Sequence, residues 1–160
     1  TARENVTQFN HEFVCSELTH TSYPPVGGNH YPIWAAFQEY SAPVPWGFLL
    51  HAMEHGAVVI AYRCEDESSC TLADDLRAIM EERPDDPLCA GQASPNRMIL
   101  VPDPELTEPI AVVSWGRMYL ATCLDPESLH AFIDVAYGNA RENLCNAGMD
   151  GSATGWCAAP

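Results

Sequence analysis

Short apolar runs along the chain predict a β-sheet. The run AVVIAY after Gly56 has the length and the β-branched content of a buried central strand. Residues 97–101 and 110–114 form two further apolar runs, and residues 118–122 follow a Trp-Gly-Arg turn. We expect these three segments to be strands that pair as hairpins.

Helical spacing of apolar residues appears in two segments. The first follows Thr71, has Leu72, Leu76 and Ile79 on one face, and ends before Pro84. The second begins at Asp125, which has the character of an N-cap residue and is followed by proline. Its apolar positions predict a helix that continues to about residue 144.

The order of these elements predicts an α+β fold with a mixed or mostly antiparallel sheet and two main helices. Residues 1–45 are rich in proline and glycine and show no sustained period, so we expect a loop-rich N-terminal arm packed on the domain. Residues 46–145 would form the α+β core, and residues 146–160 a disulfide-tethered C-terminal tail. All three belong to one domain, which suits a chain of 160 residues.

The net charge and the cysteine content limit the expected partners and the expected cellular compartment. With 22 acidic and 7 basic side chains, the net charge of -15 repels phosphate backbones, so nucleic acid is not an expected partner. No run of 18 apolar residues predicts a membrane span. Seven cysteines favour an oxidising compartment, which means a secreted, periplasmic or cell-envelope protein. The start at Thr1, without methionine, is what removal of a signal peptide would leave.

The spacing of the cysteines suggests two disulfides. Cys64 and Cys70 bracket a short polar loop, and a bond between Cys145 and Cys157 would hold the tail. An odd number of cysteines leaves one that is free, binds metal or bridges to a second molecule. A homo-oligomer or filament, built through the unpaired cysteine or the N-terminal arm, is therefore one hypothesis.

The stretch LLHAMEHG places His51 and His55 one helical turn apart on the same face. Because Gly56 is a natural helix-ending residue, the pair should lie at a junction that a loop can approach. The segment HTSYPPVGGNH offers His30 as a third ligand and His20 as a candidate fourth. We expect His11, near the chain end, and His130, beside an apolar helix face, to lie outside the site.

Three neutral imidazoles suit both Cu²⁺ and Zn²⁺, and the Irving–Williams order favours copper over zinc for one transition-metal ion in a site without strong geometric restriction. Glu54 is expected to accept a hydrogen bond from an imidazole N–H, and Arg117 is a candidate partner for its carboxylate. The alternative without metal is that these histidines are ordinary, partly buried residues with hydrogen-bond partners.

These motifs together resemble the uncharacterised bacterial family called domain of unknown function 3105. That family shows a histidine, a tyrosine, Pro-Pro-x-x-Gly-x-His, His-x-x-Glu-His-Gly before an apolar strand, and Trp-Gly-Arg. The resemblance implies a secreted or envelope-associated protein, without an assigned reaction, whose histidines are placed for metal. It spans about residues 20–120, and the matching positions are His20, Tyr23, Pro24, Pro25, Gly28, His30, His51, Glu54, His55, Gly56, Trp115, Gly116 and Arg117.

Other functions have weaker support. The sequence HAMEH matches the inverted zinc-hydrolase motif with Glu54 as general base, but those enzymes need a longer motif helix than Gly56 permits. The chain has no Gly-x-Ser-x-Gly, phosphate-loop, dinucleotide or Cys-x-x-Cys motif, so we assign no catalytic residue. The two main hypotheses are thus an extracytoplasmic metal-binding protein and a self-assembling extracellular subunit in which the metal site is structural.

Overall fold

The computed structural model describes residues 2–3, 9–65 and 70–157 and contains one mixed β-sheet with three α-helices. The predicted α+β class is therefore confirmed. The sheet has the strand order β1-β5-β4-β2-β3. The elements are β1 (Ala2–Arg3), α1 (Trp46–Glu54), β2 (Val58–Tyr62), α2 (Leu72–Glu81), the 3₁₀-helix η2 (Pro87–Cys89), β3 (Met98–Pro102), β4 (Ile110–Ser114), β5 (Arg117–Ala121) and α3 (Pro126–Ala136).

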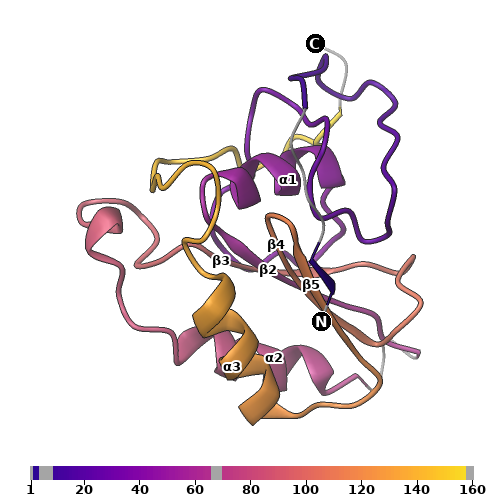
Figure 1. The fold of residues 1–160 in the computed structure, drawn as a ribbon, viewed down its shortest axis with the longest axis vertical. Helices are drawn as coiled ribbons and strands as arrows, with labels where there is room; N and C mark the ends of the chain where they lie inside the picture. Colours follow the sequence, from indigo (N-terminus) through magenta and orange to yellow (C-terminus); the bar gives the residue numbers. More distant parts are fainter. Residues whose placement is uncertain (1, 4–8, 66–69, 158–160) are drawn as a thin grey trace.

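Both faces of the sheet are covered, which explains why its central strands are apolar without alternation. Figure 1 shows α2 and α3 against one face and α1 with the N-terminal arm on the other. Along β2, Val59 and Ala61 pack in the core beneath α1, whereas Val58 and Ile60 pack in the core beneath α2 and α3. The chain thus builds two apolar layers on one sheet, and α1 belongs to the layer nearest the arm.

The pairing of the strands agrees only partly with the hairpins expected from the sequence. β4 and β5 form an antiparallel hairpin as predicted. The prediction is wrong for β3, which runs parallel to β2 and has α2 in the connection between them. Parallel neighbours need a long crossover, and a helix between two strands supplies one. The helix that the sequence predicted at this point was therefore the signal for parallel pairing.

The last helix is shorter than its apolar pattern suggested. α3 ends at Ala136, Tyr137 has an extended backbone, and Gly138 has a φ of 69°. The chain then turns back along the end of α1, where the backbone N–H of Glu142 donates to the carbonyl of Glu54 at 3.0 Å. The N–H of Leu144 donates to the carbonyl of His55 at 3.2 Å. These backbone bonds replace the last predicted turns of the helix.

The disulfides tie the arm and the tail to the core. Cys64–Cys70 is confirmed, but the expected Cys145–Cys157 bond is wrong. Because loop closure depends on the folded path and not on spacing in the sequence, the actual pairs are distant ones. They are Cys89–Cys145 and Cys15–Cys157.

Three disulfides within one chain point to an oxidising, extracellular type of environment. Cys123 is the free cysteine of the described residues, and it is exposed. None of the helices in the described part of the chain is long and apolar enough to cross a membrane. The proposed division at residues 45 and 145 stays a prediction.

Candidate metal centre

α1 carries two side chains of the site, and the end of this helix is fixed close to them. His51 and Glu54, three residues apart on this helix, are 6% and 4% exposed. The helix stops because Gly56 adopts a φ of 97°, a conformation that side chains rarely permit. Arg97 Nη1 donates to the carbonyl of His55 at 2.7 Å, which fixes this end of the helix in the core.

His51 presents one lone pair to the site. Its Nδ1 lies 2.7 Å from the carbonyl oxygen of Tyr31, which can only accept, so Nδ1 carries the proton. In the neutral ring, the lone pair is then on Nε2. Burial lowers the pKa of His51 to about 4, opposed by the hydrogen bond to Tyr31 and aided by the positive charges of neighbouring histidines. The ring is therefore neutral near pH 7, as a metal ligand must be.

His30 comes from the loop that leads into this helix and is fully buried. Its Nδ1 lies 2.8 Å from the carbonyl oxygen of Gly28, and its Nε2 lies 3.1 Å from Oε2 of Glu54. A carbonyl and an ionised carboxylate both accept and neither donates. The space between Nε2 and Oε2 therefore requires a positive charge, which a proton or a metal ion can supply.

Glu54 is the acidic member of the site. Burial by itself raises the pKa of Glu54. The hydrogen bond from His30 and the charges of the surrounding imidazoles lower it by more than burial raises it, so the net pKa is below its usual value. The expected partner Arg117 instead donates to the carbonyls of Trp115 and Asn139. The arginine near Glu54 is Arg141, whose Nε lies 3.8 Å from Oε1.

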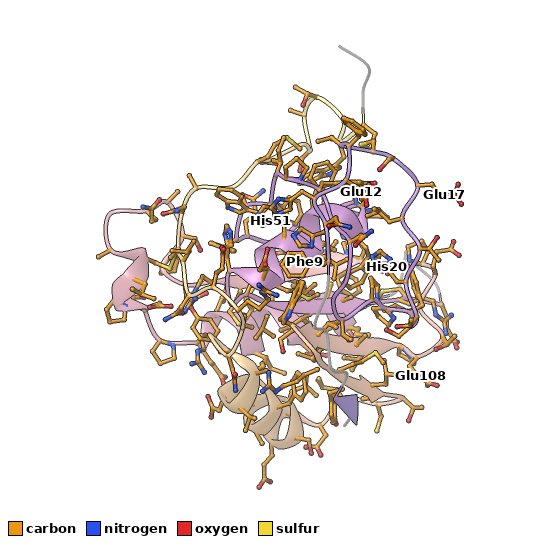
Figure 2. The ribbon with its side chains drawn as sticks, turned by 45° about the horizontal axis from the view of Figure 1, so that its top comes forward. Phe9, Glu12, Glu17, His20, His51 and Glu108 are labelled. Atoms are coloured by element: carbon orange, nitrogen blue, oxygen red, sulfur yellow. A yellow bond between two sulfur atoms is a disulfide. The ribbon has the colours of Figure 1, made fainter. Side chains whose placement is uncertain are left out.

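The N-terminal arm brings a third histidine to the site. His11 and His30 form a parallel bridge: the N–H of Glu12 donates to the carbonyl of His30 at 2.8 Å, and the N–H of His30 donates to the carbonyl of Asn10 at 3.2 Å. The ring of His11 stacks on that of His51 with 5.0 Å between centroids. Figure 2 shows this part of the arm, marked by Phe9 and Glu12, beside the helix that carries His51.

His11, His30, His51 and Glu54 each offer one ligand atom, and these four atoms all lie within 4.8 Å of one another. Ligand atoms around a tetrahedral ion at 2.0–2.1 Å are separated by roughly 3.4 Å, so a small contraction brings the four donors to bonding distance. His11 is exposed and the other three are buried. The cluster can therefore hold a metal ion at the boundary between the core and the solvent.

Of the four histidines expected from the sequence, His30 and His51 belong to this group of four, and the ring of His55 contacts that of His51 with 4.7 Å between centroids. The ring of His20 lies elsewhere on the arm, with Nε2 2.9 Å from the carbonyl oxygen of Asn29. His55 is outside the group of four as well, since its Nε2 faces Oε2 of Glu142 at 3.3 Å. Its buried Nδ1 has no hydrogen-bond partner among the described residues, and burial lowers the pKa of this ring.

Sequence reasoning left out His11 because of its place near the chain end. It gave Glu54 a hydrogen-bonding role or, in the zinc-hydrolase alternative, the role of general base, but not that of a metal ligand. A usable signal existed for Glu54, because a residue three positions after His51 lies on the same helical face. For His11 the local sequence holds no such signal, since its place depends on how the arm pairs with His30.

Comparison with known families agrees with the resemblance seen in the sequence. A family model described as "Protein of unknown function (DUF3105)" matches residues 11–148. The match covers most of the chain, so the protein belongs to this family. No curated protein and no solved structure gave a significant match.

Proposed function

We propose that this DUF3105 protein is an extracytoplasmic metal-binding protein that holds one transition-metal ion through His11, His30, His51 and Glu54. The observation that carries the proposal is the position of His30. Both of its ring nitrogens face acceptors, the carbonyl oxygen of Gly28 and the carboxylate of Glu54. A metal ion between Nε2 and Oε2 balances that carboxylate and uses the lone pair that each ring directs inward.

The donor set narrows the class of metal. Three neutral imidazoles and one carboxylate are typical ligands for divalent ions such as Cu²⁺ and Zn²⁺, whereas Cu⁺ prefers sulfur. The Irving–Williams order places copper above zinc for such nitrogen and oxygen ligands. We therefore propose copper as the favoured ion, with zinc as the alternative.

The metal content of the protein, purified without chelators, tests this proposal. We expect about one copper or zinc per chain and a lower unfolding temperature after chelation, because binding to the folded state alone stabilises it. His51→Ala and Glu54→Gln should both lose metal. His130→Ala is the matched control, because His130 lies away from the cluster and pairs with Glu82.

A buried variant such as His51→Ala can fail to fold, so circular dichroism must show native helix content before its metal content is interpreted. Glu54→Gln keeps the size of the side chain and serves as the second test. A tenfold lower metal content in the wild type, with unchanged stability after chelation, would remove the site.

Self-assembly is a second candidate, favoured by the free and exposed Cys123. In a protein with three other disulfides, such a thiol is available to join two copies of the chain. Intact mass measured with and without reductant tests this, and a doubled mass that collapses on reduction is the expected result. A single-chain mass in both samples would reject covalent assembly.

A further inference from the structure

We infer that the metal ion enters and leaves the centre by exchange at His11. The protein would then transfer its ion to an incoming ligand, and the ion would not be a permanently bound structural one. This inference rests on the proposed function and adds the route of exchange. It follows from the unequal way in which the four candidate ligands are held.

Three of the ligands are fixed in the core. His30 is held at Nδ1 by the carbonyl of Gly28, and His51 at Nδ1 by the carbonyl of Tyr31. Glu54 is buried on α1 beside His30. Turning any of these side chains away would break a buried hydrogen bond or leave a buried charge without its partner, both of which are costly.

His11 is held differently. Its side chain is exposed, and its ring contacts among the described residues are aromatic ones with Phe9, His30 and His51. The hydrogen bonds that fix the arm here belong to its neighbours, Asn10 and Glu12. The ring of His11 can therefore rotate toward solvent while the backbone of the arm stays paired. Since an exposed rotamer exchanges far faster than a buried group, His11 should be the first ligand to leave.

Departure of His11 would leave two histidines and one glutamate, with an open position toward solvent. Three protein ligands and one exchangeable position are characteristic of metal sites that react with external molecules. The arm also carries Glu12 directly after His11, within a protein of net charge -15. This charge disfavours an anionic ligand, so the incoming group should be a neutral nitrogen donor such as an imidazole.

The test compares copper-loaded wild type with His11→Ala, using His130→Ala as the matched control. Transfer of copper to an excess of free histidine is followed by stopped-flow absorbance; at pH 7 free histidine is a zwitterion with little net charge, and it chelates copper through its imidazole and α-amino nitrogens. His11→Ala should still bind one copper and release it about ten- to a hundredfold faster, because loss of affinity appears mainly in the dissociation rate. His130→Ala should transfer at the wild-type rate.

Added imidazole gives a second measurement that a purely structural role for His11 would not move. At low concentration it should shift the copper spectrum of His11→Ala toward that of the wild type, since it fills the position left by the side chain. The wild-type spectrum should change only at much higher imidazole concentrations, at which free imidazole competes with the ring of His11. Copper release from His11→Ala at the wild-type rate, or failure of this variant alone to bind copper, would overturn the inference. A wild-type protein that binds no metal would overturn the proposed function as well.

Discussion

Asp86→Asn tests how the end of α1, and with it the candidate metal centre, is held in place. Arg97 is 2% exposed, and its Nη1 donates to the carbonyl of His55, the C-cap residue of α1. Its Nε and Nη2 both donate to Oδ2 of Asp86, at 3.0 and 2.8 Å. Asp86 therefore balances the buried cation that anchors this end of the helix.

The expected cost follows from this burial. Removing one partner of a buried ion pair destabilises a protein by about 3–5 kcal/mol, because the remaining charge is left buried without an opposite charge. Asparagine keeps one oxygen that can accept a hydrogen bond, so we expect the lower end of this range. For a domain of this size, about 3 kcal/mol lowers the midpoint of thermal unfolding by about 6–12 °C.

Thermal and urea unfolding followed by circular dichroism measure this effect. Asp85→Asn is the matched control: Asp85 is exposed, and its replacement should change the free energy of unfolding by less than about 0.5 kcal/mol. A loss below about 1 kcal/mol in Asp86→Asn would contradict the argument, because it would equal the loss of an ordinary hydrogen bond.

Two further predictions concern the same end of α1. Burial alone raises the pKa of Asp86, but hydrogen bonds from Tyr137, the Leu88 N–H and Arg97 outweigh it, so the net pKa is lowered. The Asp86 carboxylate therefore binds a proton less readily in the folded state than in the unfolded state. The stability that Asp86 contributes is present above its ordinary pKa of 3.8, and it is lost as the pH falls through the lower pKa of the folded state. The stability difference between wild type and Asp86→Asn, measured by urea unfolding, should thus be constant near neutral pH and shrink below pH 3.8; a difference that grows with acidification would contradict this. Gly56→Ala should cost more than about 2 kcal/mol, because the added Cβ would lie 2.5 Å from Arg97 Nη1 at a φ of 97°. Gly91→Ala, with a similar φ of 82° and nothing within 4 Å of the added Cβ, measures the cost of the backbone strain alone. Equal losses of unfolding free energy in the two variants would show that the clash with Arg97 contributes nothing.

Features set by neighbouring residues were predictable from the sequence. The run after Gly56 is apolar because β2 is covered on both faces, and this composition marked it as a central strand. Asp125 accepts from the N–H of Ser128, as an N-cap residue should, so the start of α3 could be placed correctly. Cys64–Cys70 closes a loop short enough to be recognised.

Features set by contacts between distant segments were not predictable in this way. Cys15 pairs with Cys157 across 142 residues, and no spacing rule selects that partner. His11 reaches the site because the arm forms a bridge with His30, nineteen positions away, a contact that depends on the path of the whole loop. Equally, His55 has the helical spacing of a ligand but turns toward Glu142, because the segment after α3 folds back onto α1.

X-ray absorption spectroscopy of the copper-loaded protein tests the central claim most directly. The account predicts a first shell of nitrogen and oxygen atoms at about 2.0 Å, with the outer-shell scattering of three imidazole rings and no sulfur. A spectrum without imidazole scattering, or with sulfur in the first shell, would contradict a centre built from His11, His30, His51 and Glu54.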